Sequence, residues 1–299
     1  MARRLFVVFN PSAGRNLRAR LDAVLAAVEA AGGRFKLAET GSVADAGNAI
    51  RAAARSGEHD AIVAAGGDGT VRLAATAAIN TGIAIGYIPL GTGNVLAHEL
   101  RLDRSPSALA ALLCHGAVSE IELAAANNAP FLLMAGMGFD GRVVAALNRT
   151  TKSYFGKAAF VLPALKAIRA PLDRLTVTVD GQRHAANWAV IANASHYGGH
   201  FVIAPDTHIA THGLCAVMIS ATGRMSLAGK LAQIGLGRIA MAARDPDSGI
   251  RIVPCSHAVV ESLRPVPVQI DGDVAGHATR LDVKAAAARI PLITGNLRR

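Results

Sequence analysis

Aromatic residues are scarce in this 299-residue chain, since eight Phe, three Tyr and one Trp make up only 4% of it. Proteins that bind single-stranded nucleic acid stack the bases on aromatic side chains. The basic residues are scattered along the chain rather than gathered into runs, which also argues against nucleic acid. We therefore expect no nucleic acid among the partners of this protein.

Cysteines and long apolar runs are also rare. Cys114, Cys215 and Cys255 are the only cysteines, they lie far apart and they form no C-x-x-C pair, which favours a reduced cytoplasmic protein. The apolar run at residues 5–9 is too short for a signal peptide. The apolar stretch at residues 225–243 is interrupted by two basic residues, and it falls short of the ~20 clean residues of a membrane span.

Acidic residues are outnumbered, with 21 Asp and Glu against 31 Lys and Arg, which leaves a net charge of +10. Such a balance suits an anionic partner, either a nucleotide or an acidic membrane surface, although a merely solvated surface is an equally good interpretation. The hydrophobic fraction of 52% excludes intrinsic disorder. A chain of this length is typical of two domains.

The order of predicted elements divides the chain. Up to about residue 120, strands predicted at 5–9, 34–37, 61–65 and 83–88 alternate with helices predicted at 17–31, 43–55, 71–79 and 106–115. This alternation favours an open parallel α/β sheet. From residue 118 short strands follow closely, with helical inserts at 157–169 and 226–243, and they favour a β-sandwich or a large antiparallel sheet. The expected strands lie at 131–134, 175–179, 188–192, 201–203, 214–219, 250–253, 258–263, 266–270 and 280–283. We expect domains at 1–123 and 124–299.

Three glycine-rich turns follow strands of the first domain. Their sequences are Asn10-Pro11-Ser12-Ala13-Gly14, Gly66-Gly67-Asp68-Gly69-Thr70 and Pro89-Leu90-Gly91-Thr92-Gly93-Asn94. The carboxyl ends of parallel strands meet at one sheet edge, where ligands bind in such folds. Glycines let backbone N–H groups approach phosphate oxygens, and each turn leads into a helix N-terminus. The three turns together predict a phosphate-binding site.

Asp68 lies between glycines in the second turn. A carboxylate there can hold a Mg2+ ion that bridges phosphates, or take a proton from an attacking hydroxyl. The alternative is that Asp68 only caps the helix expected to begin near Val71.

These motifs resemble those of the diacylglycerol kinase catalytic domain superfamily, which includes sphingosine kinases, ceramide kinases and soluble bacterial lipid kinases. The resemblance covers nearly the whole chain. It continues through Gly136-Met137-Gly138-Phe139-Asp140, Tyr197-Gly198-Gly199, Ala204-Pro205-Asp206 and Ile270-Asp271-Gly272-Asp273. The Gly-Gly-Asp-Gly motif is shared with NAD kinases and phosphofructokinases as well.

The resemblance implies an α/β domain and a β-sandwich domain of the NAD kinase type, with ATP in the cleft between them. The positions that it implies for the nucleotide are Asn10 to Gly14, Thr40, Gly66 to Thr70, Gly91, Thr92, Asn94 and Asp271. Asp68 would serve Mg2+ and share in catalysis, and Asp273 would accept the proton of the lipid hydroxyl. The implied substrate is a lipid at the membrane surface, reached through transient peripheral contact. The oligomeric state stays open, with a homodimer as one option.

The chain departs from the family pattern at two points. The late acidic motif usually ends in Glu, and here it ends in Asp273, which is one methylene shorter. Where family members carry an Asp-Gly pair at a structural Mg2+ site, this chain has His212-Gly213. Histidine is a poor ligand for a hard cation, so we do not predict that structural site here.

Two other motifs have rival interpretations. The run from Gly136 to Gly141 fits G-x-G-x-x-G, but the acid that a dinucleotide fold requires about 20 residues later is missing. His196, His200, His208 and His212 lie within a short segment, as a zinc site would require, yet glycines and Pro205 favour strands and turns over the helix that would bring them together. We expect neither a Rossmann site nor zinc.

The leading hypothesis is therefore an ATP- and Mg2+-dependent kinase that phosphorylates a lipid hydroxyl, with diacylglycerol or a related lipid as the acceptor. The first alternative is an NAD kinase-like enzyme that acts on a soluble substrate. The second is a nucleotide-sensing, membrane-associated protein that has lost catalysis, which Asp273 and His212 keep open.

Overall fold

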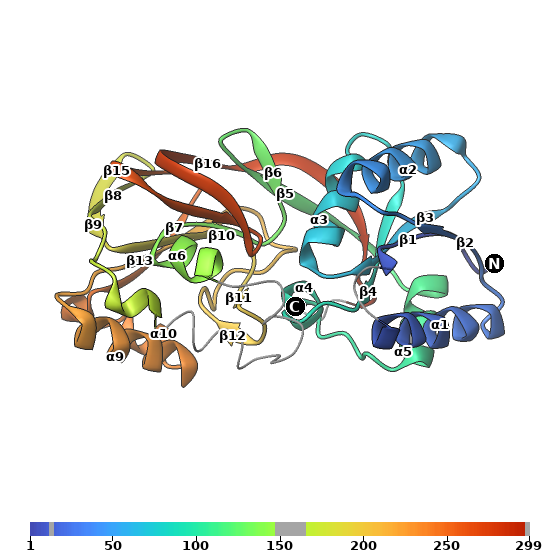
Figure 1. Cartoon of the computed structure of the whole chain (residues 1–299), viewed down its shortest axis with the longest axis horizontal. Helices are drawn as coiled ribbons and strands as arrows, with labels where there is room; N and C mark the ends of the chain where they lie inside the picture. Colours follow the sequence, from blue (N-terminus) through green and yellow to red (C-terminus); the bar gives the residue numbers. More distant parts are fainter. Residues whose placement is uncertain (12–14, 147–165, 297–299) are drawn as a thin grey trace. The chain divides into compact units, whose positions relative to one another are not determined.

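The computed structural model of the chain describes residues 1–11, 15–146 and 166–296 (Figure 1). They divide into two compact units, the first made of residues 1–121 with the described residues from Ala288 onward, and the second of residues 122–287. The sequence placed the last residues with the second domain. They belong to the first unit because the end of the last strand pairs in parallel with one of its strands, with Leu292 beside Ile85.

The first unit is built on a parallel sheet. Its strands β1 (Arg4–Phe9), β2 (Arg34–Glu39), β3 (Ala61–Gly66) and β4 (Ala84–Pro89) run in the order β2-β1-β3-β4. The end of β16 (Asp273–Ile293) follows β4, and β5 (Val118–Ala126) pairs with β16. The helices are α1 (Arg15–Ala30), α2 (Val43–Ser56), α3 (Asp68–Ala77), α4 (Val95–Glu99) and α5 (Pro106–His115).

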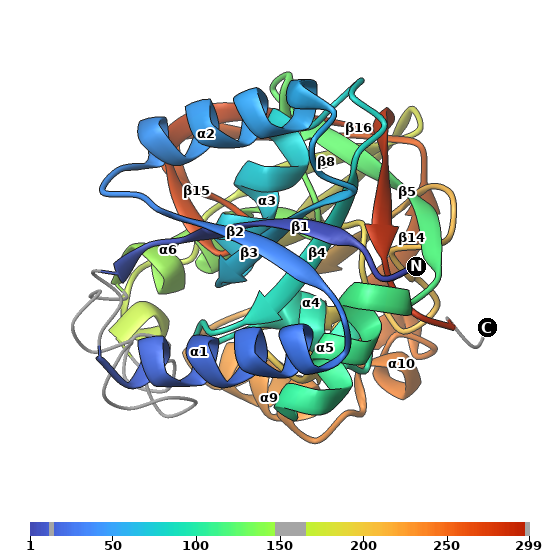
Figure 2. The ribbon, with the colours of Figure 1, turned by 90° about the vertical axis from the view of Figure 1, so that its right-hand side faces the viewer.

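Helices cover both faces of this sheet, with α1 and α5 on one side and α2 and α3 on the other (Figure 2). Alternate residues of a strand point to opposite faces, and Leu5, Val7 and Phe9 accordingly pack in one cluster with α1 and α5 residues such as Leu21 and Leu113. The parallel α/β unit predicted from the sequence is confirmed.

The second unit is antiparallel. Strands β14 (Ile250–Cys255), β13 (Leu214–Ile219), β10 (Trp188–Ala192), β7 (Met134–Gly138) and β15 (His257–Ile270) lie next to one another in that order. The remaining strands are β6 (Ala129–Phe131), β8 (Leu175–Val179), β9 (Gln182–Ala186), β11 (His196–Tyr197) and β12 (Phe201–Val202).

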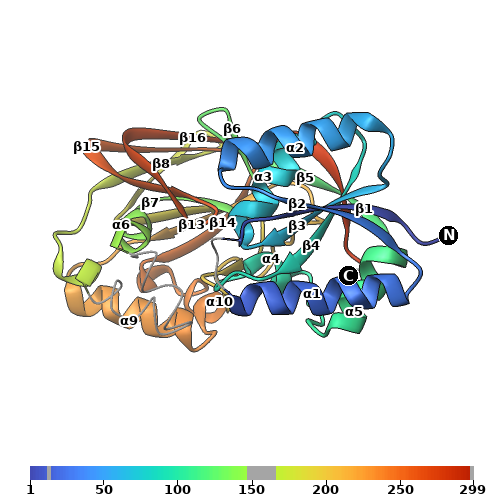
Figure 3. The same cartoon turned by 45° about the vertical axis from the view of Figure 1, so that its right-hand side comes forward.

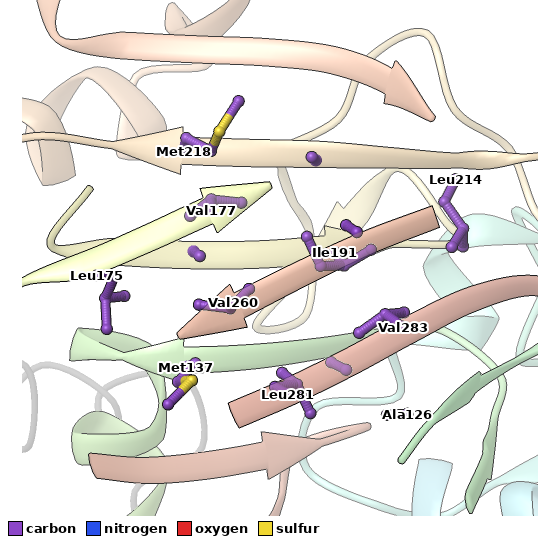
Figure 4. Packing of buried hydrophobic residues seen from close by; sticks show 14 of the residues in the cluster. Ala126, Met137, Leu175, Val177, Ile191, Leu214, Met218, Val260, Leu281 and Val283 are labelled. Atoms are coloured by element: carbon purple, nitrogen blue, oxygen red, sulfur yellow. The ribbon is translucent and has the colours of Figure 1, made fainter. Parts of the chain in front are cut away.

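Strand β15 pairs with three other strands of this unit. Its first part pairs with β8 and its last part with β7, and the pairing with β16 is irregular between Glu261 and Val266. The apolar side chains between these strands form the core of the unit, in which Val177, Met218 and Leu281 take part (Figure 4). The predicted β-sandwich is confirmed, and the strands expected at 258–263 and 266–270 are one strand.

The helices of the second unit are α6 (Phe139–Ala146), α9 (Arg224–Gly235) and α10 (Ile239–Ala242), followed by the 3-10 helix η3 (Pro246–Ser248). The helix expected at 226–243 is two helices, because Gly237 between them has a φ of 67°. The helix expected at 157–169 falls mostly outside the described residues, and residues 166–169 are helical. No helix in the part of the chain that the structure describes is long and apolar enough to cross a membrane.

Candidate functional site

The second and third glycine-rich turns of the first unit lie against each other. The Gly66 carbonyl accepts hydrogen bonds from the Leu90 and Gly91 amides, at 2.8 and 3.1 Å. A Cβ atom on Gly91 would lie only 2.6 Å from the Gly67 Cα, so glycine is required at this approach. The turns after β3 and β4 therefore form one backbone surface at the carboxyl edge of the sheet.

Asp68 joins these two turns. It is the first residue of α3, and its two carboxylate oxygens accept hydrogen bonds from the Val95 and Leu96 amides at the start of α4, each at 3.0 Å. Asn94, the N-cap residue of α4, makes no side-chain cap bond. The capping role considered from the sequence is therefore present, but Asp68 caps α4 and not the helix that it begins.

Asn94 uses its side chain in a different way. Its Oδ1 accepts a hydrogen bond from the Tyr87 hydroxyl at 2.9 Å, and its Nδ2 donates to the Gly91 carbonyl at 2.6 Å. Asn94 has a φ of 45°, in the left-handed region that Asn tolerates. Burial, and then the charge of Asp68, raise the pKa of the Tyr87 hydroxyl well above its ordinary value. Tyr87 and Asn94 thus connect the third turn to strand β4 through two hydrogen bonds.

Asn10, which begins the first turn, lies at the same edge of the sheet. Phe9 pairs with Ala65 on one side, so Asn10 follows β1 at the level where Gly66 ends β3. On the other side the Thr40 amide donates to the Phe9 carbonyl at 2.9 Å, and Thr40 is buried. Asn10 and Pro11 are exposed, whereas Ser12, Ala13 and Gly14 lie outside the described residues.

The other predicted positions in the two joined turns are accessible. Gly67, Gly69 and Thr70 are half-buried, and Thr92 is exposed. A Cβ on Gly66 would lie 2.3 Å from the Thr70 Oγ1, so the start of α3 packs tightly on the end of β3. These residues therefore reach solvent, and Gly67 and Gly69 add no side chain at this edge of the sheet.

Asp271 and Asp273 lie in the second unit, at the turn between β15 and β16. Asp271 and Gly272 have φ values of 50° and 78°, which with the Asp-Gly sequence indicates a type I′ hairpin turn. The Asp271 carboxylate accepts hydrogen bonds from three consecutive amides, those of Leu132 (2.9 Å), Leu133 (2.8 Å) and Met134 (3.0 Å). Asp271 is buried, whereas Asp273 is exposed as the first residue of β16.

A second buried carboxylate, that of Asp140, is linked to this hairpin through Gln269, and it was not among the predicted site residues. Asp140, at the start of α6, has no exposed surface, and it accepts hydrogen bonds from the Tyr197 hydroxyl and from the Gln269 Nε2, the latter at 2.7 Å. The Gln269 Oε1 accepts the Gly272 amide at 2.7 Å. Burial raises the pKa of Asp140 to about 6, although both donors lower it. Asp140 and Tyr197 both lie in motifs that carry the family resemblance, so that resemblance was the signal that could have identified them.

The glycines around Asp140 have a steric explanation. A Cβ on Gly136 would lie 1.8 Å from the Asp140 Oδ2, and one on Gly141 would lie 2.1 Å from the Pro267 carbonyl oxygen. Gly138 has a φ of 85°. The G-x-G-x-x-G spacing therefore lets α6 pack directly on β7 and β15.

Each of the four clustered histidines has a neighbour of its own. His196 forms a hydrogen bond with Ser195 and His212 with Glu122, both at 2.9 Å. The His200 ring lies tilted against Phe201, with ring centroids 4.3 Å apart. The His208 Nδ1 accepts the Ala210 amide at 3.2 Å. Over the described ranges, three or more His, Cys, Asp or Glu side chains nowhere gather as metal ligands would.

Comparison with known protein families finds two matches along the chain. Residues 4–126 match the family described as "Diacylglycerol kinase catalytic domain", and residues 134–291 match the "YegS C-terminal NAD kinase beta sandwich-like domain". The chain belongs to the diacylglycerol kinase catalytic domain family. The expected family is thus confirmed, and with it the class of lipid kinases.

Individual proteins are similar to most of the chain. A Pseudomonas aeruginosa protein named "Probable lipid kinase YegS-like" is 30% identical over 98% of this chain and 95% of its own length. The "Diacylglycerol kinase" of Bacillus subtilis is 27% identical over 73% of each chain. An uncharacterized Synechocystis protein is 28% identical over 76% of this chain, which spans about half (53%) of that relative. A solved structure titled as a diacylglycerol kinase from Bacillus anthracis shares the fold, with a TM-score of 0.74 at 21% identity, covering 99% of this chain and 98% of that one.

Proposed function

We propose that this lipid kinase family member transfers the γ-phosphate of ATP to the hydroxyl of a membrane lipid, with diacylglycerol as the first candidate. The observation that carries the proposal is the carboxylate of Asp68 between two joined glycine-rich turns at the carboxyl edge of the parallel sheet. The relative from Bacillus subtilis that is named for diacylglycerol supports the choice of acceptor.

The nucleotide phosphates would lie on the backbone of the glycine-rich turns. Gly67 and Gly91 approach each other more closely than a Cβ atom on Gly91 would allow, so the backbone there carries no side-chain bulk. The Gly91 amide already donates to the Gly66 carbonyl, so the phosphate contacts would come from other amides of the turns. Backbone N–H groups in such turns bind anionic oxygens. The side chains and backbone of Asn10, Thr40, Thr70 and Thr92 would complete the phosphate and ribose contacts, together with the segment from Ser12 to Gly14.

Asp68 fits a Mg2+ ion bound to the phosphates. Mg2+ takes oxygen ligands and keeps most of its waters, so one carboxylate with phosphate oxygens is a normal set. Asp68 is only half-buried, so its carboxylate reaches solvent at the edge of the sheet where the phosphates would lie. When bound, Mg2+ neutralises charge on the transferred phosphate.

Asp273 would act as the general base. The pKa of an alcohol is far above 7, so a carboxylate that takes the proton during attack lowers the barrier. The lipid hydroxyl oxygen would form a bond to the γ-phosphorus while the bond from that phosphorus to the bridging oxygen breaks. ADP leaves with the electron pair, and the proton passes to Asp273.

Asp271 has contacts that favour a positioning role over nucleotide binding. Its carboxylate accepts three backbone amides and is buried, so it holds the turn that presents Asp273. Because the acceptor is a lipid, the protein would make transient contact with a membrane during each turnover.

The test is transfer of labelled phosphate. The protein, Asp68→Asn and Asp273→Asn are incubated with γ-labelled ATP, Mg2+ and a lipid panel in mixed micelles, beside NAD. We expect labelled diacylglycerol, with a loss of about 100-fold or more in each variant, since a general base contributes about 10²–10⁴-fold. Asp247→Asn changes an exposed carboxylate elsewhere in the second unit and serves as the control. Unchanged transfer in both site variants would refute the assignment, and labelled NAD would replace the lipid as acceptor.

A further inference from the structure

Helix α9 turns an apolar side toward solvent, whereas a surface helix usually exposes a polar one. Met225 and Leu236, at and just beyond its ends, are 86% and 66% exposed, and Gly229 and Ala232 lie exposed between them. Their spacing of four, three and four residues places all four positions on one side of a helix. A surface helix normally turns polar residues outward. From residue 225 to 236, all of which the structure describes, no charged residue lies on this outward side.

The polar group of α9 lies inside instead. Lys230 is the charged residue between Met225 and Leu236, and it is buried with its ammonium donating to the Ser248 carbonyl at 2.5 Å. Leu227 and Ile234 share this inward side, and the helix packs against β12. It also packs against α10, which follows it in the chain (Figure 3). The inward side of α9 thus packs on the second unit through Leu227, Lys230 and Ile234, and the apolar outward side is left exposed.

The neighbouring short helix α10 also exposes an apolar side chain. Met241 in α10 is 64% exposed, and α10 packs against α9. Three exposed arginines adjoin this surface, Arg224 before α9 and Arg238 and Arg244 on either side of α10. Asp245 and Asp247 follow, and the Asp245 carboxylate accepts the Asp247 amide at the start of η3. We call the surface of Met225, Gly229, Ala232, Leu236 and Met241 the α9 face.

The chemistry of the α9 face fits a lipid surface better than a second protein chain. A helix of 12 residues is about 18 Å long, so its outward side offers a few hundred Å2 at most, against about 800 Å2 for each partner of a stable complex. A bilayer interface accepts small apolar faces that bury Met and Leu at the level of the headgroups. The adjoining arginines and the net charge of +10 are complementary to anionic headgroups.

We propose that the α9 face docks on the surface of an anionic phospholipid bilayer, with Met225, Leu236 and Met241 among the headgroups and the arginines above them. The proposal rests on the proposed function only in that a lipid acceptor requires a membrane visit. Docking itself requires neither ATP nor transfer, so it can be measured separately.

The first experiment measures co-sedimentation with vesicles of phosphatidylglycerol and phosphatidylcholine, and with vesicles of phosphatidylcholine alone. The test variant is Met225→Asp/Leu236→Asp. Leu263→Asp is the matched control, because Leu263 is 94% exposed on β15 of the same unit. We expect the test variant to lose at least about tenfold in apparent vesicle affinity, since two apolar side chains no longer enter the interface. Leu263→Asp should bind like the unchanged protein.

Three results would overturn the docking proposal. The first is full vesicle binding by the test variant, and the second is an equal loss in Leu263→Asp. The third is a dimer of the unchanged protein in light scattering that the test variant converts to a monomer, which would assign the α9 face to a second copy. Circular dichroism and a thermal melt establish that both variants fold. Binding should also fall as salt is raised, because salt screens the arginines.

A second measurement separates this proposal from the kinase proposal. Transfer to a long-chain lipid in vesicles should fall in the Met225→Asp/Leu236→Asp variant, while transfer to a short-chain lipid dissolved as monomers should not. A protein that binds vesicles through the α9 face but transfers no phosphate would uphold docking and refute the kinase. Phosphate transfer to the vesicle lipid that does not depend on the α9 face would uphold the kinase proposal and refute docking through this face.

Discussion

Asp68 in the first unit and Asp271 in the second make the same kind of contact. Each carboxylate accepts backbone amides at the start of a distant segment, two amides of α4 for Asp68 and the three amides that lead into β7 for Asp271. They differ in exposure, because Asp271 is 6% exposed and Asp68 is half-buried. A carboxylate enclosed with its donors serves the fold, whereas one that still reaches solvent can also meet a ligand.

The largest effect should come from Asp271. Replacement by Ala leaves three amides without their acceptor and places Ala at a φ of 50°, so we expect a loss of about 4 kcal/mol in the free energy of unfolding. Urea unfolding measures it. Asp271→Asn keeps one acceptor oxygen and tolerates the left-handed backbone, so about half of the loss should return. A loss below about 1 kcal/mol for the Ala variant would show that the carboxylate does not hold the turn.

The next effect should come from Asp140 and should depend on pH. Its pKa is about 6 in the folded protein against an ordinary 3.8, so the folded state binds this proton more tightly than the unfolded state does. The associated stability is complete below about pH 3.8 and is lost as pH rises through about 6. A pKa difference of about 2 between the folded and unfolded states corresponds to at most about 3 kcal/mol of folding stability.

Asp140→Asn removes this titration. We expect the unchanged protein to lose up to about 3 kcal/mol more than the variant between pH 4 and 7, measured by urea unfolding across that range. Tyr197→Phe is the control, because it keeps Asp140 but removes a donor that favours the charged form, so its loss should be at least as large. Parallel pH profiles for Asp140→Asn and the unchanged protein would contradict the raised pKa.

A smaller effect is expected at Asp68. Replacement by Ala removes the cap of α4, which is worth about 1–2 kcal/mol, and it should also abolish transfer if Asp68 holds Mg2+. Thermal melting and the transfer assay measure the two consequences. Asp68→Asn retains one acceptor oxygen and should recover most of the stability without recovering activity. If Asp68→Asn recovered both the stability and the phosphate transfer, Asp68 would act only as the cap of α4.

The smallest effect on stability should be that of Asp273, which sharpens the comparison within one hairpin. Its side chain is exposed, so Asp273→Ala should change the free energy of unfolding by less than about 0.5 kcal/mol. The proposed base function nevertheless predicts loss of transfer. Asp273→Glu restores the residue usual in the family and should keep activity. A strongly destabilised Asp273→Ala would mean that the whole turn, not Asp271 alone, supports the fold.

Several local features could be read from the sequence because short-range rules decide them. The helix expected at 106–115 and the strand at 188–192 have those bounds in the structure, since Pro at a helix start and an apolar run between turns act locally. Helix α3 begins three residues earlier than expected, at Asp68, because the chain turns directly into the helix after Gly67. The pair Asp271-Gly272 forms the tight hairpin turn for which its residue types are suited.

The sequence by itself determined the parallel and antiparallel halves of the chain and the places of the glycine-rich turns, because both depend on residues that are neighbours in the chain. Only the tertiary structure decided what each carboxylate contacts. The amides bonded to Asp271 lie 137–139 positions away in the chain, and those bonded to Asp68 lie 27 and 28 positions away. Pairing over such separations depends on how strands and helices pack, and residue type alone carries no information about it.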